Sequence, residues 1–192
     1  MSVADRSIDP RIIESAKEEF LQKGFLDASL QEICKNAGVT TGALYKRFKG
    51  KEELFCALVE STVQDLEEVV RQKSVLPATL TDEQLKKAWD MDREYMQWWF
   101  DYLYDRYDEM RLLLVFSDGT KYANFEHEWV EGMSHTTYAY YKEAQRRGLT
   151  KTDISEKEMH VMLSSFWTAI CEPLIHGFTK EEAGRISDLM CG

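Results

Sequence analysis

Residues 29–54, SLQEICKNAGVTTGALYKRFKGKEEL, decide the fold of this chain. Their apolar residues recur at the spacing of short helices, and Gly38 separates two such helices. Ser29 and Glu32 have the spacing of a capping box, and Lys51 opens a further helix. The stretch therefore predicts a helix, a glycine turn, a second helix and the start of a third, which is the order of a helix-turn-helix motif.

The charge of this stretch is opposite in sign to that of the whole chain. Between Lys35 and Lys51 there are five basic side chains and no acidic one, whereas the 192-residue chain has 34 acidic and 24 basic residues. A local basic surface on an acidic protein is suited to binding a polyanion, and the helix-turn-helix pattern indicates duplex DNA. Residues 1–55 carry nine basic and nine acidic side chains. We therefore expect modest non-specific affinity, with specific binding by a dimer that contacts two half-sites.

The candidate DNA-binding residues follow from the way a helix-turn-helix motif docks. Its second helix enters the major groove, and the residues at the N-terminus of that helix meet the base edges. Small residues there allow close approach, and a threonine can contact a thymine methyl or donate a hydrogen bond. Basic and aromatic residues one turn further on can reach phosphates, as can side chains at helix N-termini. The candidates are Ser29, Thr40, Thr41, Gly42, Tyr45, Lys46, Lys49 and Lys51. The alternative is a small helical bundle whose lysines are merely solvated.

The chain after residue 55 is also expected to be helical. Apolar residues recur at helical spacing over 51–73, 81–116, 121–147 and 155–177, with a break near 104–108 and a last short helix from residue 179. No apolar run is flanked by hairpin turns, so no strand is predicted. The predicted fold is all-α, with a helix-turn-helix domain at 1–55, a helical domain at 56–192 and a linker at 74–80.

The composition excludes several classes of protein. Hydrophobic residues make up 44% of the chain, which is enough for a buried core, so global disorder is excluded. No signal peptide or bilayer-spanning run is present, so we expect a cytoplasmic protein with no membrane partner. Neither metal-ligand spacing nor a catalytic motif is found, so no metal, no cofactor and no enzyme activity are predicted. The cysteines are interpreted as buried, reduced thiols, with redox sensing at Cys191 as the alternative.

The stretch resembles the TetR family of bacterial transcriptional repressors. The matching residues are FLDASLQEICKNA at 25–37 and GVTTGALYKRFKGKEEL at 38–54, with the Leu-Tyr-X-X-Phe-X-X-Lys-Glu run typical of the family. Arg47 departs from the histidine or tyrosine of many relatives, and Ala28-Ser29 replaces a frequent pair of threonines. The resemblance implies a divergent helical C-terminal domain that binds a small molecule and dimerises through its last two long helices, here 121–148 and 155–177.

The aromatic residues of 89–141 are candidates for the ligand pocket of that domain. Taken singly, each aromatic residue is more simply a core residue, but as a set they could line a pocket for a flat, apolar ligand. A cationic ligand is a variant, because aromatic faces attract cations and Asp92 and Glu126 lie near these faces. The candidate ligand residues are Trp89, Asp92, Met96, Trp99, Leu103, Phe116, Tyr122, Phe125, Trp129 and Tyr140. The dimerisation candidates are Met159, Met162, Phe166, Ile170 and Leu174.

These expectations describe a ligand-responsive repressor. It would bind palindromic operator DNA as a homodimer, with its recognition helices in successive major grooves, about 34 Å apart. A small-molecule effector would then change that spacing and release the operator. A second hypothesis is a ligand-binding helical protein whose DNA contacts are vestigial, and a third is an enzyme.

Overall fold

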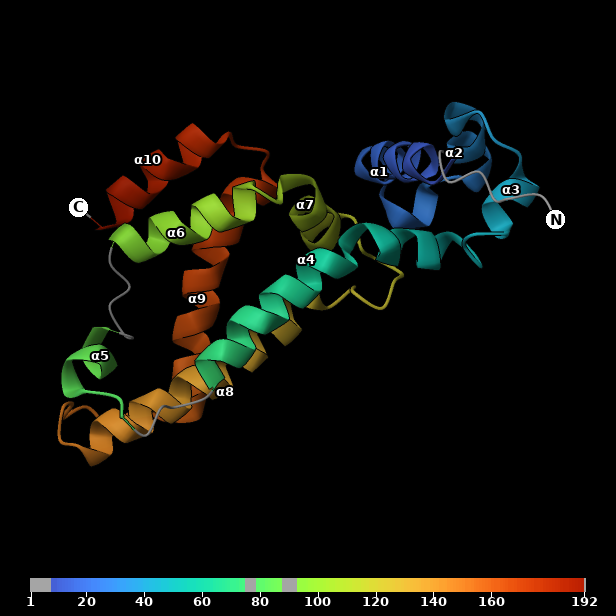
Figure 1. The fold of residues 1–192 in the computed structure, drawn as a ribbon. Helices are drawn as coiled ribbons and strands as arrows, with labels where there is room; N and C mark the ends of the chain where they lie inside the picture. The colour runs from blue at the N-terminus through green and yellow to red at the C-terminus, as the bar shows by residue number, and fades with distance from the viewer. Residues whose placement is uncertain (1–7, 75–78, 88–92, 192) are drawn as a thin grey trace. The chain divides into compact units, whose positions relative to one another are not determined.

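The computed structural model describes residues 8–74, 79–87 and 93–191, and every regular element within them is an α-helix (Figure 1). The all-α fold with an N-terminal helix-turn-helix is thereby confirmed. The predicted linker at 74–80 lies largely outside the described residues, as do Trp89 and Asp92. The helices are α1 Ile8–Asp27, α2 Leu30–Ala37, α3 Thr41–Tyr45, α4 Lys51–Ser74, α5 Asp82–Lys87, α6 Arg93–Tyr104, α7 Tyr107–Val115, α8 Phe125–Arg146, α9 Glu156–Ile175 and α10 Lys180–Cys191.

Two of the predicted helix boundaries agree with the structure, and a third differs from it. The break predicted near 104–108 separates α6 from α7, and α9 begins after Ser155 with a complete capping box. The long helix predicted from Lys121 instead starts at Phe125. The residues before it form turns, because the Ser117 hydroxyl donates to the carbonyl of Leu113 and the Thr120 hydroxyl donates to the carbonyl of Ser117. The sequence offered no cap to mark that start.

The chain forms two compact units that do not divide at residue 55. The first comprises Met1–Gln64 with Tyr107–Asn124, and the second comprises Asp65–Arg106 with Phe125–Gly192. Residues 107–124 join the first unit because they pack on α1: Phe25 donates its N–H to the carbonyl of Phe116 over 3.0 Å. Helix α4 has residues in both units. The predicted division 1–55 and 56–192 thus stays a prediction about functional parts.

The core of the first unit is a cluster of phenylalanines. Phe20, Phe25 and Phe55 have ring centroids 5.2–6.0 Å apart and come from α1 and α4. Leu44, which is fully buried, adds α3 to the core of this unit. Each buried aromatic or leucine side chain contributes about 1.5–3 kcal/mol of hydrophobic stabilisation. The short helices α2 and α3 are therefore held by tertiary packing, since helices of this length are marginal in isolation.

The core of the second unit is a cluster of tryptophans. Trp99 of α6, Trp129 of α8 and Trp167 of α9 have ring centroids 5.3–6.2 Å apart. Helix α9 packs on α8, and α10 packs on α6 (Figure 1). None of the helices in the described residues is long and apolar enough to cross a membrane.

Candidate nucleic-acid interface and ligand pocket

Helix α2 is fixed at its N-terminus by Ser29 and by a buried carboxylate of α1. The Ser29 hydroxyl accepts the N–H of Glu32 at 3.5 Å, but the Ser29 N–H donates to Glu19 at 3.0 Å. The predicted Ser29–Glu32 capping box is therefore only half formed, because Glu19 replaces Glu32 as the acceptor. Burial alone would raise the pKa of Glu19, but bonds from Lys23 and from the Ser29 N–H outweigh it and hold that pKa below its ordinary value.

The turn between α2 and α3 depends on glycine. Gly38 has φ 64° and ψ 37°, in the left-handed region that disfavours other residues. Its N–H donates to the carbonyl of Lys35, and the following Val39 donates to the carbonyl of Cys34. These bonds satisfy the last carbonyls of α2 and redirect the chain into α3. The turn thus sets the angle at which α3 leaves α2.

The N-terminal tip of α3 projects into solvent. Thr40, Thr41, Gly42 and Lys46 are exposed, and Tyr45 is 53% exposed. The Thr40 hydroxyl oxygen accepts the N–H of Ala43 at 3.2 Å, so its hydroxyl hydrogen can donate outward. A short helix with threonine, glycine, tyrosine and lysine on its exposed side and Leu44 on its buried side has the features of a recognition helix.

Lys51 has a structural role that the sequence did not indicate. Its ammonium donates to the carbonyls of Leu26 and Ala28 at 2.9 and 3.0 Å, and it lies 4.8 Å from the centroid of the Phe25 ring. These contacts join the start of α4 to the end of α1. The carbonyl partners could not have been found from spacing, because they lie more than twenty residues earlier in the chain. An ammonium has three donors, so a phosphate contact is still compatible with this arrangement.

The remaining candidates for DNA contact are placed in two ways. Lys49 has an exposed side chain, while its N–H donates to Glu53 at 2.6 Å. Ser29 is half-buried and is occupied in capping α2. Arg47 donates to the carbonyl of Ala43 at 3.2 Å, so it supports α3. Arg47 is not among the candidates, and the DNA-binding role of the eight candidate residues stays a prediction.

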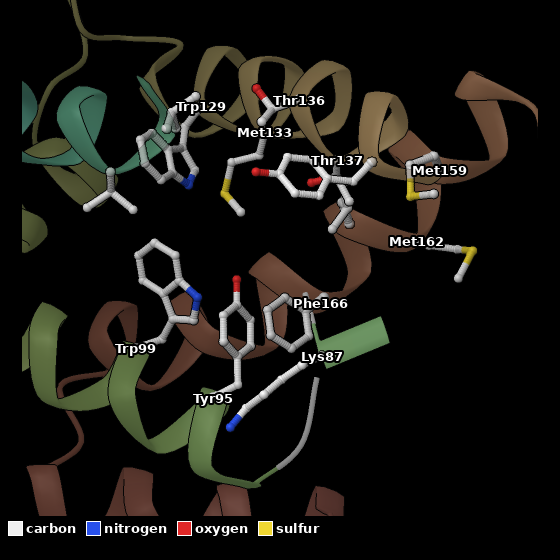
Figure 2. Close-up of a pocket in the computed structure, with 14 residues that line it drawn as sticks. Lys87, Tyr95, Trp99, Trp129, Met133, Thr136, Thr137, Met159, Met162 and Phe166 are labelled. Carbon is white, nitrogen blue, oxygen red and sulfur yellow. The ribbon is translucent and has the colours of Figure 1, made fainter. Parts of the chain in front are cut away.

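The second unit contains a partly open apolar cavity of about 190 Å³ (Figure 2). Its walls come from α4, α5, α6, α8 and α9. A volume of about 10–15 Å³ holds one water, so this cavity has room for an organic ligand of roughly a dozen non-hydrogen atoms. The lining residues are Val69, Val70, Lys87, Tyr95, Trp99, Trp129, Met133, Thr136, Thr137, Tyr140, Met159, Met162, Leu163 and Phe166.

Aromatic rings form much of the cavity wall. Trp99 and Trp129 meet edge to face with centroids 6.2 Å apart, and Tyr95 stacks on Phe166 at 6.0 Å. Figure 2 shows the Tyr95 hydroxyl and the Trp129 indole nitrogen directed toward the open space between these rings. Lys87, at the end of α5, is the one charged residue of the described lining.

The predicted ligand residues are only partly brought together. Trp99, Trp129 and Tyr140 line the cavity. Met96 and Leu103 are buried in the core without lining it, because they lie on a different face of α6 from Tyr95. The other candidates do not line it either: Phe125 stacks on Trp129 at 6.5 Å, Phe116 and Tyr122 belong to the first unit, and Trp89 and Asp92 lie outside the described residues.

Glu126, named as a possible partner for a cation, does not line the cavity. Burial and the charge of Glu172 raise its pKa. The lining residues that the sequence missed, above all Tyr95, Phe166 and Lys87, come from three helices. Periodicity shows which residues share a helix face, but not which faces of different helices meet.

The predicted dimerisation stripe on α9 needs correction. Met159, Ile170 and Leu174 are at most 1% exposed, because this side of α9 packs against α6 and α8 of the same chain. Phe166 is half-buried and lines the cavity. Of the predicted set, Met162 alone is exposed, at 49%. The outward side of α9 also carries Val161, Ser165 and Thr168.

The thiols and possible metal ligands add no further site. Cys34 and Cys171 are buried, and burial raises the pKa of Cys171 well above its ordinary value. The side chain of Cys191 lies outside what the structure describes. Within the described residues, no group of three or more His, Cys, Asp or Glu side chains could hold a metal ion.

Comparison with known proteins agrees with this arrangement. Residues 12–58 match the model of the "Bacterial regulatory proteins, tetR family". The transcriptional regulator SrpR of Pseudomonas putida is 46% identical over 57 residues, which is 30% of this chain and 27% of SrpR. The chain likewise matches only 42% of the length of TtgW from Pseudomonas putida. The transcriptional repressor AcnR of Corynebacterium glutamicum is 24% identical over 200 residues, covering 100% of this chain and 97% of AcnR.

Solved structures extend the likeness in fold to the whole chain. The TetR family regulator PfmR from Thermus thermophilus has a TM-score of 0.62 at 17% identity and covers 97% of both chains. The regulator FadR of Bacillus subtilis, in complex with stearoyl-CoA, has a TM-score of 0.58 at 18% identity, covering 95% of both chains.

Proposed function

Because this chain belongs to the TetR family of bacterial regulatory proteins, we propose that it is a ligand-responsive transcriptional regulator, acting as a repressor. It binds palindromic operator DNA as a homodimer and is released by a small-molecule effector. The observation that carries the proposal is the exposed tip Thr40–Lys46, supported from below by the buried Leu44. Members of this family bind DNA and small-molecule effectors and are usually dimers.

The tip has the chemistry that DNA recognition requires. Thr40 and Thr41 offer hydroxyl and methyl groups to base edges, and Gly42 lets the backbone approach closely. Tyr45 and Lys46, one turn later, reach the phosphates. A protein with this role works in the compartment that holds the chromosome, which in bacteria is the cytoplasm.

The effector site of this proposal is the apolar cavity of the second unit. The cavity is lined by aromatic and methionine side chains with a few polar groups, as small-molecule sites usually are. FadR of Bacillus subtilis, which shares the fold, was solved with stearoyl-CoA bound. The relatives named above are regulators of transcription, and we propose no catalytic role for this chain.

Effector binding reaches the DNA-binding tip through α4. This helix starts at Lys51, just after α3, and carries Val69 and Val70 in the cavity lining. A ligand that touches these valines biases the position of α4, and a coupling of about 1–3 kcal/mol suffices to change operator affinity. The effector therefore needs a different affinity for the DNA-bound and the free arrangements of the dimer.

The dimer interface of this proposal is the outward face of α8 and α9. Val161, Met162, Ser165 and Thr168 are exposed on α9, and Gly132 is exposed on α8. Exposed apolar side chains flanked by small residues suit a self-complementary two-fold contact. Val161→Glu is expected to convert the dimer to monomers in sedimentation analysis and to weaken operator binding. An unchanged sedimentation coefficient would place the interface elsewhere.

Operator binding tests the whole proposal. DNA fragments selected by the protein from its own genome are labelled, and binding is followed by fluorescence anisotropy at several salt concentrations. Tyr45→Ala and Lys46→Ala should each weaken binding strongly without changing stability, because both side chains are exposed. Lys86→Ala, an exposed lysine of α5, is the matched control.

The second hypothesis, a ligand-binding protein with vestigial DNA contacts, predicts a different result. In that case no sequence-selective binding is found, and Tyr45→Ala changes nothing. The exposed tip favours the regulator.

A further inference from the structure

The polar atoms that face the cavity carry information about its ligand. Resting on the proposed function, in which this cavity holds the effector, we propose that the ligand is an apolar carboxylate. Its body is about the size of a bicyclic aromatic ring, and an oxygen of its carboxylate accepts a hydrogen bond from Trp129. Lys87 at the rim supplies the counter-charge.

The indole N–H of Trp129 is a buried donor that lacks an acceptor. Trp129 is 7% exposed, and its Nε1 has no hydrogen-bond partner among the described residues. An indole N–H can only donate, and burying it unpaired is unfavourable. Figure 2 shows this nitrogen directed toward the cavity that Trp129 lines. A ligand oxygen at this place would satisfy the indole N–H, whereas a hydrocarbon or an ammonium group could not.

A second tryptophan serves as an internal comparison. Trp167 is 1% exposed, and its Nε1 likewise has no partner among the described residues. It packs 5.4 Å from Trp129 but does not line the cavity. The two indoles therefore share chemistry and burial, but only Trp129 lines the cavity. This difference supplies a matched control for Trp129.

The charge in the described lining is positive. Lys87 is the charged residue among the described lining residues, and no described acid lines the cavity. Lys87 forms no ion pair within the described residues, and Figure 2 shows it beside Tyr95 at the edge of the cavity. A buried cation would lose its hydration without a carboxylate to replace it. An anion gains the Lys87 ammonium as a partner.

The cavity has flat aromatic walls and a limited volume. Trp99, Trp129 and the stacked pair Tyr95 and Phe166 offer flat apolar walls. A cavity of about 190 Å³ has room for a fused two-ring body. The ligand class is therefore an aromatic or similarly compact apolar acid.

A set of matched probes tests this class on the full chain by isothermal titration calorimetry. The probes are 2-naphthoate, 2-naphthamide, 2-methylnaphthalene and 2-naphthylmethylammonium, which share one ring system and differ in the group attached to it. We expect naphthoate to bind most tightly, the neutral amide next, and the hydrocarbon and the ammonium compound most weakly.

Two substitutions separate the two polar contacts. Lys87→Met should weaken naphthoate about tenfold while changing naphthamide less than about twofold, because only the anion uses the charge. Trp129→Phe should weaken both oxygen-bearing probes about fivefold or more beyond its effect on the hydrocarbon, which loses only ring contact and no hydrogen bond. The matched controls are Lys86→Met, an exposed neighbour outside the lining, and Trp167→Phe.

Several outcomes would overturn the inference. These are tighter binding of the ammonium probe than of naphthoate, equal effects of Lys87→Met and Lys86→Met, or binding of none of the probes. If Trp129→Phe fails to fold, the comparison of Lys87→Met with Lys86→Met still decides the question, because both lysines are exposed. Failure of the proposed function looks different: naphthoate binds as expected, but no DNA sequence is recognised by the same protein.

Discussion

Lys51 and Lys46 are both lysines of the predicted DNA-binding surface, but they should respond differently to the same substitution. Lys46 is exposed, whereas Lys51 donates to two carbonyls of the α1–α2 connection, Leu26 and Ala28. Methionine keeps the aliphatic stem and removes the ammonium. Lys51→Met should therefore destabilise the first unit as well as weaken DNA binding, while Lys46→Met should only weaken DNA binding.

The magnitude follows from the contacts of Lys51. Its hydrogen bonds to the carbonyls of Leu26 and Ala28 measure 2.9 and 3.0 Å, and one of them is exposed to solvent. Because one of the two bonds is exposed to solvent, we assign about 1 kcal/mol to each, the typical net value of an intramolecular hydrogen bond. The cation above the Phe25 ring adds about 0.5 kcal/mol. Lys51→Met should thus lower the free energy of unfolding by about 2.5 kcal/mol, and Lys46→Met by less than about 0.5 kcal/mol.

Urea unfolding followed by circular dichroism measures the two stabilities, and anisotropy against operator DNA at several salt concentrations measures binding. Each substitution should reduce the slope of log affinity against log salt by about one if the lysine contacts a phosphate. Equal urea midpoints for the two variants would refute the structural role of Lys51. A lower midpoint with an unchanged salt slope would leave Lys51 a purely structural residue.

Three further predictions address other positions. Gly42→Ala should leave stability unchanged or raise it by about 0.5 kcal/mol, since the added Cβ would meet no neighbouring side chain closer than the Thr40 hydroxyl oxygen at 4.0 Å. It should nevertheless weaken operator binding, and unchanged anisotropy would exclude close backbone approach to DNA. Arg147→Met should weaken 2-naphthoate binding in calorimetry, because Arg147 holds α5 through the Leu80 carbonyl; unchanged affinity would show that α5 is held otherwise. Burial raises the pKa of Glu19 and hydrogen bonds lower it, and the net result lies below 4.5. The stabilisation by the Glu19 carboxylate is therefore present above pH 4.5 and is lost as the pH falls through the lowered pKa. The difference in urea midpoint between Glu19→Gln and wild type should shrink from about pH 7 to about pH 3, and a constant difference would contradict this.

Local signals in the sequence were sufficient for the helices and the turn. Gly38 could be assigned to the turn between two helices, and residue 155 to the start of a helix, because both depend on neighbours within a few residues. The exposed tip of α3 followed in the same way, from the alternation of Leu44 with Tyr45 and Lys46. What failed at this level was the second half of the Ser29–Glu32 capping box, because the acceptor of the Ser29 N–H is Glu19 from another helix.

The ligand pocket depends on how different helices face one another. Tyr95 and Met96 are adjacent in sequence, yet Tyr95 lines the cavity and Met96 is buried in the core. Met159 and Met162 share one helix, yet Met159 is 1% exposed and Met162 is 49% exposed. Which neighbouring element covers each helix face decides these differences, and a single sequence shows the faces of one helix but not which faces of different helices meet.

Helix α4 carries residues of both candidate sites, so ligand binding and operator binding are expected to be thermodynamically linked. Lys51 joins the first turn of α4 to the connection that precedes α2, and Val69 and Val70 of its later turns line the cavity. If ligand binding biases α4 and thereby lowers operator affinity, operator binding must lower ligand affinity by the same factor. Weakening the Lys51 contacts loosens the end of α4 at the DNA-binding unit and should reduce that factor without altering ligand affinity in the absence of DNA. Lys51→Met should thus change the coupling between ligand and operator without changing ligand affinity, because Lys51 lies outside the cavity lining and the substitution leaves the lining residues intact.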